Sequence, residues 1–224
     1  MARVLGVLGG MGPAATTAFL ARLQALTPAK GDEDHIRVIA DINPQVPHRH
    51  TQPDAAGRTL GEMARALKAA GAQVLAMPCN TAHAHADAIR AANLPFIDMI
   101  AETAKAAGAT GARRVGVLAT PGAARLYAEA LAADRLEMVA PSPAERERFM
   151  QAVFGVKAGD VGPDQRAAMR DLAKALIAAG AEAVIGGCTE VPLLLDQGDV
   201  DAPLIDSAEV LARACVAACR LTGR

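Results

Sequence analysis

Two of the four cysteines stand in sequences that could carry chemistry, because each follows a short apolar run and precedes small polar residues. Cys79 ends the run GAQVLAMPC and is followed by Asn80 and Thr81, whereas Cys188 ends the run AEAVIGGC and is followed by Thr189. Such runs are typical of short buried strands, so each cysteine should lie at the turn that leaves a strand. In open α/β sheets that edge binds ligands, and the N–H groups of a following helix favour a thiolate there.

The two cysteine segments belong to a longer internal repeat. Cys188 follows Cys79 by 109 positions, and the tripeptide Gly-Val-Leu at 116–118 follows its copy at 6–8 by 110 positions. Two landmarks with nearly the same offset indicate a duplication. We therefore expect an α/β protein with two similar lobes related by pseudo-twofold symmetry, each a mostly parallel sheet flanked by helices. The two cysteines would then face each other across an active-site cleft between the lobes.

Apolar runs alternate with amphipathic segments, and this alternation predicts the elements of both lobes. Strands are predicted at 3–8, 35–42, 71–77, 95–97, 114–118, 136–139, before Cys188 and at 204–205, and helices at 14–26, 56–70, 81–90, 98–107, from the turn 119–122 to about 132, from 143, at 164–179 and at 207–221. Gly155 and Gly159 are expected to break the helix that begins at residue 143. The run 108–113 marks the junction, which gives an N-terminal lobe at 1–108 and a C-terminal lobe at 109–206. The last helix could pack back on the first lobe.

Three other segments could place polar groups at the predicted sheet edge. The turn at 9–12 (GGMG) either cradles an anion with its backbone N–H groups or packs a strand against a helix, and the glycine pattern favours neither interpretation. A dinucleotide site is a weaker interpretation, because Asp41 lies 29 positions after Gly12, where roughly 20 is usual. Arg49 lies on a proline-stiffened loop and could hold a carboxylate in a bidentate fork. Lys157, between its two glycines, could reach the cleft.

The composition excludes several functional classes. With 224 residues, 52% hydrophobic residues and a mean hydropathy of +0.20, the chain can bury a large core and is not disordered. The net charge of −1 and the absence of a Lys/Arg cluster argue against a nucleic-acid partner. No apolar stretch approaches the roughly 20 residues of a membrane span, and the N-terminus lacks the pattern of a secretory signal. We expect a cytoplasmic protein with reduced thiols, in which Cys215 and Cys219 are core residues.

Two paired thiols suit a proton transfer better than a metal site. Four ligands are available in principle, namely Cys79, His83, His85 and Cys188. A helix beginning near residue 80, however, points the two histidines in directions about 200° apart. Inert buried thiols are the other alternative. Two thiols on opposite sides of one carbon can remove a proton from one face and return one to the other, which is racemisation or epimerisation. One cysteine would start as a thiolate and the other as a thiol, and an unperturbed pKa of roughly 8.5 makes both forms accessible.

Three segments, GVLGGMGPAAT, MPCNTAH and GGCTEVPLL, resemble the signature segments of the aspartate/glutamate racemase family, specifically its aspartate racemase branch. The resemblance runs over essentially the whole chain. Glutamate racemases are less similar, because they usually carry Cys-Thr-His where this chain has Cys188, Thr189 and Glu190. The family implies a two-base amino-acid racemase with two similar α/β lobes, commonly dimeric. It is cofactor-independent, so neither a cofactor nor a metal is expected.

The resemblance also implies a set of site residues. Cys79 and Cys188 correspond to the catalytic pair, and the implied substrate-binding residues are Met11, Arg49, Asn80, Thr81, Thr120, Lys157 and Thr189. Of these, Asn80, Thr81 and Thr189 would surround the α-amino and α-carboxylate groups of the substrate. Arg49 and Lys157 would lie near its side-chain carboxylate. The remaining two residues lie in the equivalent first turns of the two lobes.

We therefore predict a racemase that interconverts L- and D-aspartate through Cys79 and Cys188, with glutamate or a broader range of amino acids as alternatives. The family loop often reads V-P-D-R-T where this chain has V-P-H-R-H around Arg49, so the preferred side chain stays open. One other hypothesis is a maleate-type cis-trans isomerase acting on a dicarboxylate, in which one cysteine adds covalently. A non-catalytic amino-acid-binding sensor is the hypothesis from a different class. The expected partners are a small acidic amino acid and a second copy of the chain, with neither nucleic acid nor membrane.

Overall fold

Within residues 2–220, which the computed structural model describes, eight short strands form two parallel sheets that repeat one strand order. The order is β2-β1-β3-β4 in the first sheet and β6-β5-β7-β8 in the second. The strands are β1 (Leu5–Gly9), β2 (Val38–Ile42), β3 (Val74–Ala76), β4 (Phe96–Ile97), β5 (Arg114–Ala119), β6 (Glu137–Val139), β7 (Ala183–Gly187) and β8 (Leu204–Asp206). The predicted fold class, an α/β protein with two similar parallel sheets flanked by helices, is confirmed.

Helices connect the parallel strands, and most of them begin with a proline. They are α1 (Pro13–Leu26), α2 (Pro53–Ala69), α3 (Ala86–Arg90), α4 (Met99–Ala109), α5 (Pro121–Ala133), α6 (Pro143–Lys157), α7 (Pro163–Ala178) and α8 (Ser207–Cys219), with single 3₁₀ turns η1 (Asp32–Asp34), η2 (Thr81–His85), η3 (Val191–Leu193) and η4 (Gln197–Asp199). A proline in the first turn removes an N–H that would have no helical partner, and its fixed φ suits the helix. None of the helices within residues 2–220 is both long and apolar enough to cross a lipid bilayer.

The described residues fall into two units. One comprises residues 2–102 and 208–220 and holds the first sheet, whereas the other, Thr103–Ser207, holds the second sheet. The chain passes from one unit to the other within α4 and again at the start of α8, so nearly all of α8 belongs to the first unit. Residue 221, the predicted end of the last helix, lies outside the described residues.

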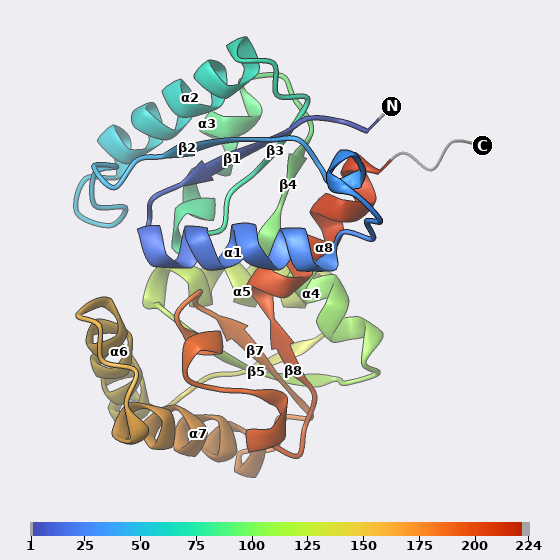
Figure 1. Cartoon of the computed structure of the whole chain (residues 1–224). Coiled ribbons are helices and arrows are strands. Elements are labelled where there is room, and N and C mark those ends of the chain that lie inside the picture. Colours follow the sequence, from blue (N-terminus) through green and yellow to red (C-terminus); the bar gives the residue numbers. More distant parts are fainter. Residues whose placement is uncertain (1, 221–224) are drawn as a thin grey trace. The chain divides into compact units, whose positions relative to one another are not determined.

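In the first unit, successive residues of each strand point to two different cores. Along β3, Leu75 packs with α2 and α3, whereas Val74 and Ala76 pack with α1 and α8. Figure 1 shows α2 and α3 on one face of this sheet and α1 and α8 on the other. Cys215 and Cys219 of α8 are fully buried in the second of these cores, as predicted. The first sheet is therefore covered on both faces, as parallel sheets generally are.

In the second unit, two glycines let helices approach the sheet from opposite faces. A Cβ atom on Gly116 would lie 3.0 Å from Leu176 of α7, and one on Gly187 would lie 2.6 Å from the ring of Tyr127 of α5. α6 packs in the same core as α7. Tyr127, the one tyrosine of the sequence, is fully buried beneath the residue that precedes Cys188. The end of β7 thus rests directly on α5.

The prediction of one helix over 81–90 is wrong, because this segment is divided. It begins with the 3₁₀ turn η2 and continues as the short helix α3. The N–H of His83 donates to the carbonyl of Asn80, three residues earlier, which is the 3₁₀ pattern. The side chain of His83 also bonds to the carbonyl of Cys79, at the start of the same turn. The tight turn therefore winds back towards the cysteine rather than leaving it as a regular α-helix.

The predicted break of α6 at Gly155 is also wrong. The helix runs through Gly155 to Lys157, and a Cβ atom on Gly155 would lie 2.9 Å from the side chain of Gln165 in α7. This glycine therefore permits the close approach of two helices, at a modest cost in helix propensity. The helix ends at Lys157, and Gly159, whose φ of +93° is left-handed, turns the chain away so that the N–H of Asp160 caps the carbonyl of Gly155. Lys157 thus lies in the last turn of a helix, not in a flexible segment between glycines.

Candidate functional site

Cys79 lies just beyond β3, at the carboxyl edge of the first sheet. Its exposed fraction is 6%, and its N–H donates to the carbonyl of Met77 at 2.8 Å, so the backbone turns sharply as the strand ends. Met11, from the turn that follows β1, packs in the same apolar cluster as Cys79. Asn80 is buried, and Thr81 is the first residue of η2. Three predicted substrate-binding residues therefore gather with Cys79 at one sheet edge.

His83 holds the backbone around Cys79. Its Nδ1 lies 2.9 Å from the carbonyl oxygen of Cys79, and its Nε2 lies 3.0 Å from the backbone nitrogen of Met99. Because the backbone N–H can only donate, Nε2 is the acceptor and Nδ1 carries the hydrogen. Burial lowers the pKa of His83, although the nearby Asp98 carboxylate acts in the opposite direction. The ring, stacked on Phe96 with centroids 5.4 Å apart, is therefore a neutral bridge between the Cys79 turn and α4.

The glycine turn after β1 is closed by a threonine. The hydroxyl of Thr16 accepts the N–H of Gly10 at 2.9 Å and donates to the carbonyl of Gly12 at 3.0 Å. Gly10 has a φ of +95°, and a Cβ atom there would lie 2.4 Å from the backbone of Asn43. The N–H of Gly10 is therefore bonded to the protein, and close packing accounts for this glycine.

Arg49 belongs to a basic cluster on the loop after β2. Its Nε is buried and has no hydrogen-bond partner among the described residues, and the same is true of Nε2 of His85. The rings of His48 and His50 lie with their centroids 5.7 Å apart. The pKa of His50 is lowered first by partial desolvation and then by the nearby basic groups His48, Arg49 and His85. His48 and His50 are exposed, as predicted. Buried N–H groups without a protein partner are rare, so this basic cluster is suited to an anion.

Cys188 lies just beyond β7, the counterpart of β3, with an exposed fraction of 7%. Its Sγ donates to Oε2 of Glu190 at 2.8 Å, and the Thr189 hydroxyl donates to the same oxygen at 3.3 Å. Nζ of Lys157 lies 3.2 Å from the other oxygen, Oε1. Burial raises the pKa of the Cys188 thiol well above its ordinary value, and the Glu190 carboxylate raises it further. The three predicted site residues Cys188, Thr189 and Lys157 therefore all contact Glu190, which the sequence analysis did not assign to the site.

Thr120 lies in the turn between β5 and α5, as the internal repeat predicts. Because Ala119 pairs with Gly187 in the second sheet, this turn and Cys188 lie at the same sheet edge. The carbonyl of Thr120 accepts the N–H of Ala124 at 2.8 Å, which is the first hydrogen bond of α5. Thr120 thus holds the same position in the second sheet as the turn of Met11 holds in the first.

Sequence reasoning gave no site role to two residues that touch the cysteine segments. Glu190 is visible in the sequence as the acid that follows Cys188 and Thr189, but its partner Lys157 lies 33 positions earlier and could not be assigned to it. The sequence suggests for His83 only the role of a metal ligand. Its spacing of four from Cys79 was the available signal, because a side chain at that spacing in a tight turn can bond back to the carbonyl of the earlier residue.

The set of metal ligands considered from the sequence is not assembled in the described part of the chain. Within residues 2–220, no group of three or more His, Cys, Asp or Glu side chains is arranged to bind a metal ion. Both ring nitrogens of His83 bond to backbone atoms. All four cysteines are thiols rather than disulfides.

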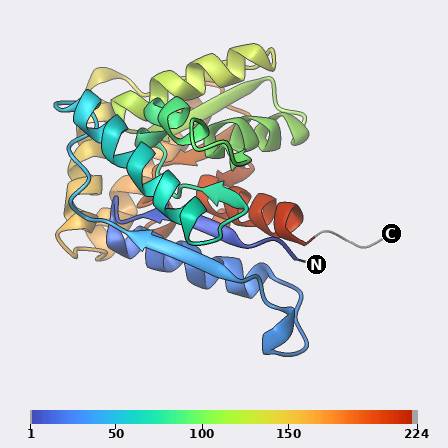
Figure 2. The same cartoon turned by 90° about the horizontal axis from the view of Figure 1, so that it is seen from above.

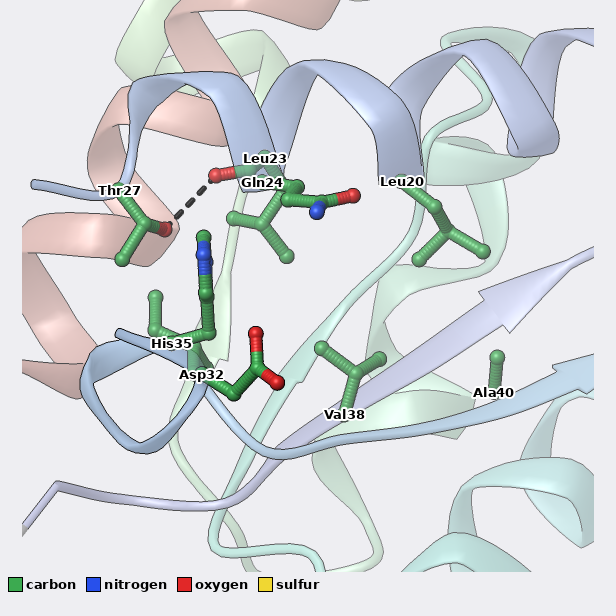
Figure 3. A pocket seen from close by; sticks show the side chains of 9 residues that line it. Leu20, Leu23, Gln24, Thr27, Asp32, His35, Val38 and Ala40 are labelled. Atoms are coloured by element: carbon green, nitrogen blue, oxygen red, sulfur yellow. Dashed lines mark hydrogen bonds between the residues drawn. The ribbon is translucent and has the colours of Figure 1, made fainter. Parts of the chain in front are cut away.

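A separate pocket of about 490 Å³ opens in the first unit between α1 and β2. Figure 2 shows β2 running alongside α1, and Figure 3 shows the side chains that line the space between them. Leu20, Leu23 and Val38 form apolar walls, and the side chain of Asp32 lies beside that of His35. None of the lining residues belongs to the predicted site set, so this pocket is part of neither cysteine site.

Comparison with known proteins assigns the family. The family model for Asp/Glu/Hydantoin racemase matches residues 8–215. The broad specificity amino-acid racemase RacX of Bacillus subtilis (strain 168) is 27% identical over 225 residues, covering 95% of this chain and 96% of RacX. The Picrophilus torridus aspartate racemase structure aligns with a TM-score of 0.82 at 26% identity, covering 97% of this chain and 94% of that one. An aspartate racemase homologue from Pyrococcus horikoshii OT3 aligns with a TM-score of 0.82 at 27% identity, covering 96% and 98%. The resemblance seen in the three sequence segments is thereby confirmed, and the chain belongs to the Asp/Glu/hydantoin racemase family.

Proposed function

We propose that the protein interconverts L- and D-aspartate by direct proton transfer between Cys79 and Cys188, without a cofactor. The observation that carries this proposal is the equivalence of the two thiols. Each is buried and lies just beyond the third strand of its sheet, in a chain that the racemase family model matches over residues 8–215. A reaction that treats the two faces of one carbon alike needs two equivalent proton carriers, which a duplicated fold supplies.

In the proposed reaction, the thiolate of one cysteine takes the α-proton of the substrate, and the electron pair of the C–H bond moves into the α-carboxylate. The thiol of the other cysteine then gives its proton to the opposite face of the α-carbon. The product has the inverted configuration, and the two cysteines have exchanged their protonation states. Asn80, Thr81 and Thr189 bind the α-amino and α-carboxylate groups, and negative charge accumulates on the α-carboxylate during the transfer.

The side-chain carboxylate of the substrate is held by the basic cluster. Arg49 supports this assignment because its buried Nε has no hydrogen-bond partner among the described residues. A carboxylate would satisfy this atom with a charge-assisted hydrogen bond. Lys157 is the second cation of the proposed site, and its Nζ lies 3.2 Å from Oε1 of Glu190. Met11 and Thr120, in equivalent turns, complete the substrate-binding set.

The proposal includes an arrangement of the two lobes. Residues 1–108 and 109–206 form the lobes, the last helix belongs with the first, and the substrate binds in a cleft to which each lobe contributes one cysteine. The working form is a homodimer. Size-exclusion chromatography with light scattering measures the oligomer, and a monomer with full activity would remove the dimer from the proposal.

Chiral chromatography after incubation with single amino acids tests the function. D-Aspartate formed from L-aspartate, at a rate unchanged by dialysis against a chelator, is the expected result. Racemisation of neutral amino acids but not of aspartate would contradict the aspartate assignment. It would instead favour a broad-specificity racemase, the activity given in the name of RacX. Conversion of maleate without racemisation would favour the cis-trans isomerase. Binding of aspartate without turnover would favour the sensor.

A further inference from the structure

The carboxylate of Glu190 is the centre of a buried group of charged and polar side chains in the second unit. Its side chain is 8% exposed. One oxygen accepts from Sγ of Cys188 at 2.8 Å and from the hydroxyl of Thr189 at 3.3 Å. The other lies 3.2 Å from Nζ of Lys157. Among the described residues, these contacts give both carboxylate oxygens a partner, as a buried charge requires.

The contact between Sγ of Cys188 and Oε2 of Glu190 needs one hydrogen between the two atoms. Because Nζ of Lys157 lies 3.2 Å from the other oxygen, the ion pair favours Glu190 as a carboxylate, which can only accept, so that hydrogen belongs to sulfur. If Cys188 were a thiolate beside ionised Glu190, two negative charges would face each other in a buried site with one lysine to offset them. With Cys188 as a thiol, the charges of Glu190 and Lys157 cancel. The geometry therefore favours a neutral Cys188.

We propose that Glu190 is a positioning residue that accepts the S–H of Cys188 and thereby sets this cysteine as the proton donor of the substrate-free protein. The proposal rests on the proposed function for its consequence. If Cys188 begins as the thiol, then Cys79 begins as the base, and the resting protein is ready for the enantiomer whose α-proton faces Cys79. The other enantiomer reacts only after the Cys188 proton has left.

The counterpart of Glu190 in the first unit cannot play the same role. When Cys79 is aligned with Cys188 and Thr81 with Thr189, the position of Glu190 corresponds to Ala82, which is fully buried. The repeat therefore carries a carboxylate after one cysteine and a methyl group after the other. This difference makes the two proton carriers unequal before any substrate binds.

The reactivity of each thiol can be measured without any turnover. Alkylation by iodoacetamide requires the thiolate, and its rate as a function of pH reports the thiol pKa. The intact protein is alkylated first and then digested with trypsin. Cys79 lies in the tryptic peptide 69–90 and Cys188 in the peptide 175–213, so mass spectrometry measures the alkylation of each cysteine separately. In the unmodified protein, Cys188 should be alkylated with a midpoint above that of an ordinary cysteine.

Two variants should shift the Cys188 midpoint in opposite directions. Glu190→Gln removes the negative charge and should increase the alkylation rate of Cys188 near pH 8 by at least about tenfold, which corresponds to one pKa unit. Lys157→Met leaves the Glu190 charge without its cation and should decrease that rate. Glu129→Gln is the matched control, because this exposed glutamate of α5 pairs with Arg125, and it should leave Cys188 unchanged. A variant that merely loosens the structure would increase reactivity in both cases.

The outcome separates this proposal from the proposed function. The proposal fails if the Cys188 alkylation rate of Glu190→Gln stays within about twofold of the unmodified protein, or if Lys157→Met increases that rate. Glu190 would then not determine the protonation of Cys188, whatever the enzyme activity. If the shifts occur but no amino acid is racemised, the positioning role stands and the racemase assignment falls. In an active enzyme, Glu190→Gln should also move the pH profile of kcat/KM, whereas a purely structural change would lower it at every pH.

Discussion

Cys79 and Cys188 hold the same position in two copies of one sheet, but the protein supports them in different ways. The turn of Cys79 is held through its backbone, because His83 bonds to the Cys79 carbonyl. At Cys188 the side chain itself is held, because its Sγ donates to Glu190. The duplicated fold thus places the two thiols equivalently, while residues two or four positions later in the chain give them different electrostatic surroundings. Equivalent topology does not imply equivalent protonation.

The strongest test of the equivalence replaces each cysteine in turn. Neither Cys79→Ser nor Cys188→Ser should racemise aspartate, with a loss of at least about 10³-fold, because a positioned base or acid contributes on that order. In heavy water, each variant should slowly exchange the α-proton of one enantiomer only, and the two variants should choose opposite enantiomers. NMR of the α-proton signal reads this directly.

Cys219→Ala is the control for the cysteine variants, since it removes a buried thiol of α8 that belongs to neither site. It should retain racemase activity. Exchange of the same enantiomer by both serine variants would show that the two cysteines do not flank the reacting carbon.

Removing His83 should affect the first site through stability. His83→Leu removes the hydrogen bonds that the ring makes to the buried carbonyl of Cys79 and to the N–H of Met99. Since a typical hydrogen bond contributes about 0.5–1.5 kcal/mol, the loss of two should lower the free energy of unfolding by about 1–3 kcal/mol. Urea denaturation followed by circular dichroism measures this, with His50→Ala as an exposed control expected within about 0.5 kcal/mol of wild type. Equal stability of both variants would mean that the bridge contributes little.

Substitution of the two cations, Arg49 and Lys157, should have one effect in common and one that differs. Arg49→Ala and Lys157→Ala should each lower kcat/KM for aspartate relative to neutral amino acids by about 10- to 150-fold, the equivalent of 1.5 to 3 kcal/mol for a lost charge-assisted bond. Only Lys157→Ala should also change the reactivity of Cys188, because Lys157 neutralises Glu190. Arg125→Ala, an exposed arginine of α5, is the control. Unchanged selectivity in both variants would place these cations outside the site.

The smallest expected effect is an acid sensitivity that belongs to the first unit. Burial lowers the pKa of His83 in the folded protein, so between roughly pH 6.5 and that lower pKa the unfolded chain binds up to one proton more than the folded chain. The free energy of unfolding should therefore fall as the pH decreases, by at most about 1.4 kcal/mol per pH unit for this group. The stability difference between wild type and His83→Leu should narrow over the same range. A constant difference between pH 7 and pH 5 would show that His83 does not titrate in this way.

The sheet edges were predictable from sequence because apolar runs and the 109-residue repeat mark where each strand ends. The contacts that hold the side chains at those edges were not predictable from sequence. Gly155 signals a break when only the chain itself is considered, but the space it leaves is filled by Gln165 of the next helix. Similarly, a pairing such as Lys157 with Glu190 depends on where a helix ends relative to a strand. Periodicity locates elements, whereas contacts between elements decide which polar groups meet.

The burial of Tyr127 against Gly187 gives the second unit an optical signal of its own. The chain contains one tyrosine and no tryptophan, so its intrinsic ultraviolet emission comes almost entirely from a ring that lies against the residue before Cys188. Any rearrangement at the end of β7, whether through ligand binding or unfolding, changes the environment of that ring. Tyrosine fluorescence therefore reports on the second unit, which carries Cys188. The first unit, which carries Cys79, contains neither tyrosine nor tryptophan and would need an engineered probe.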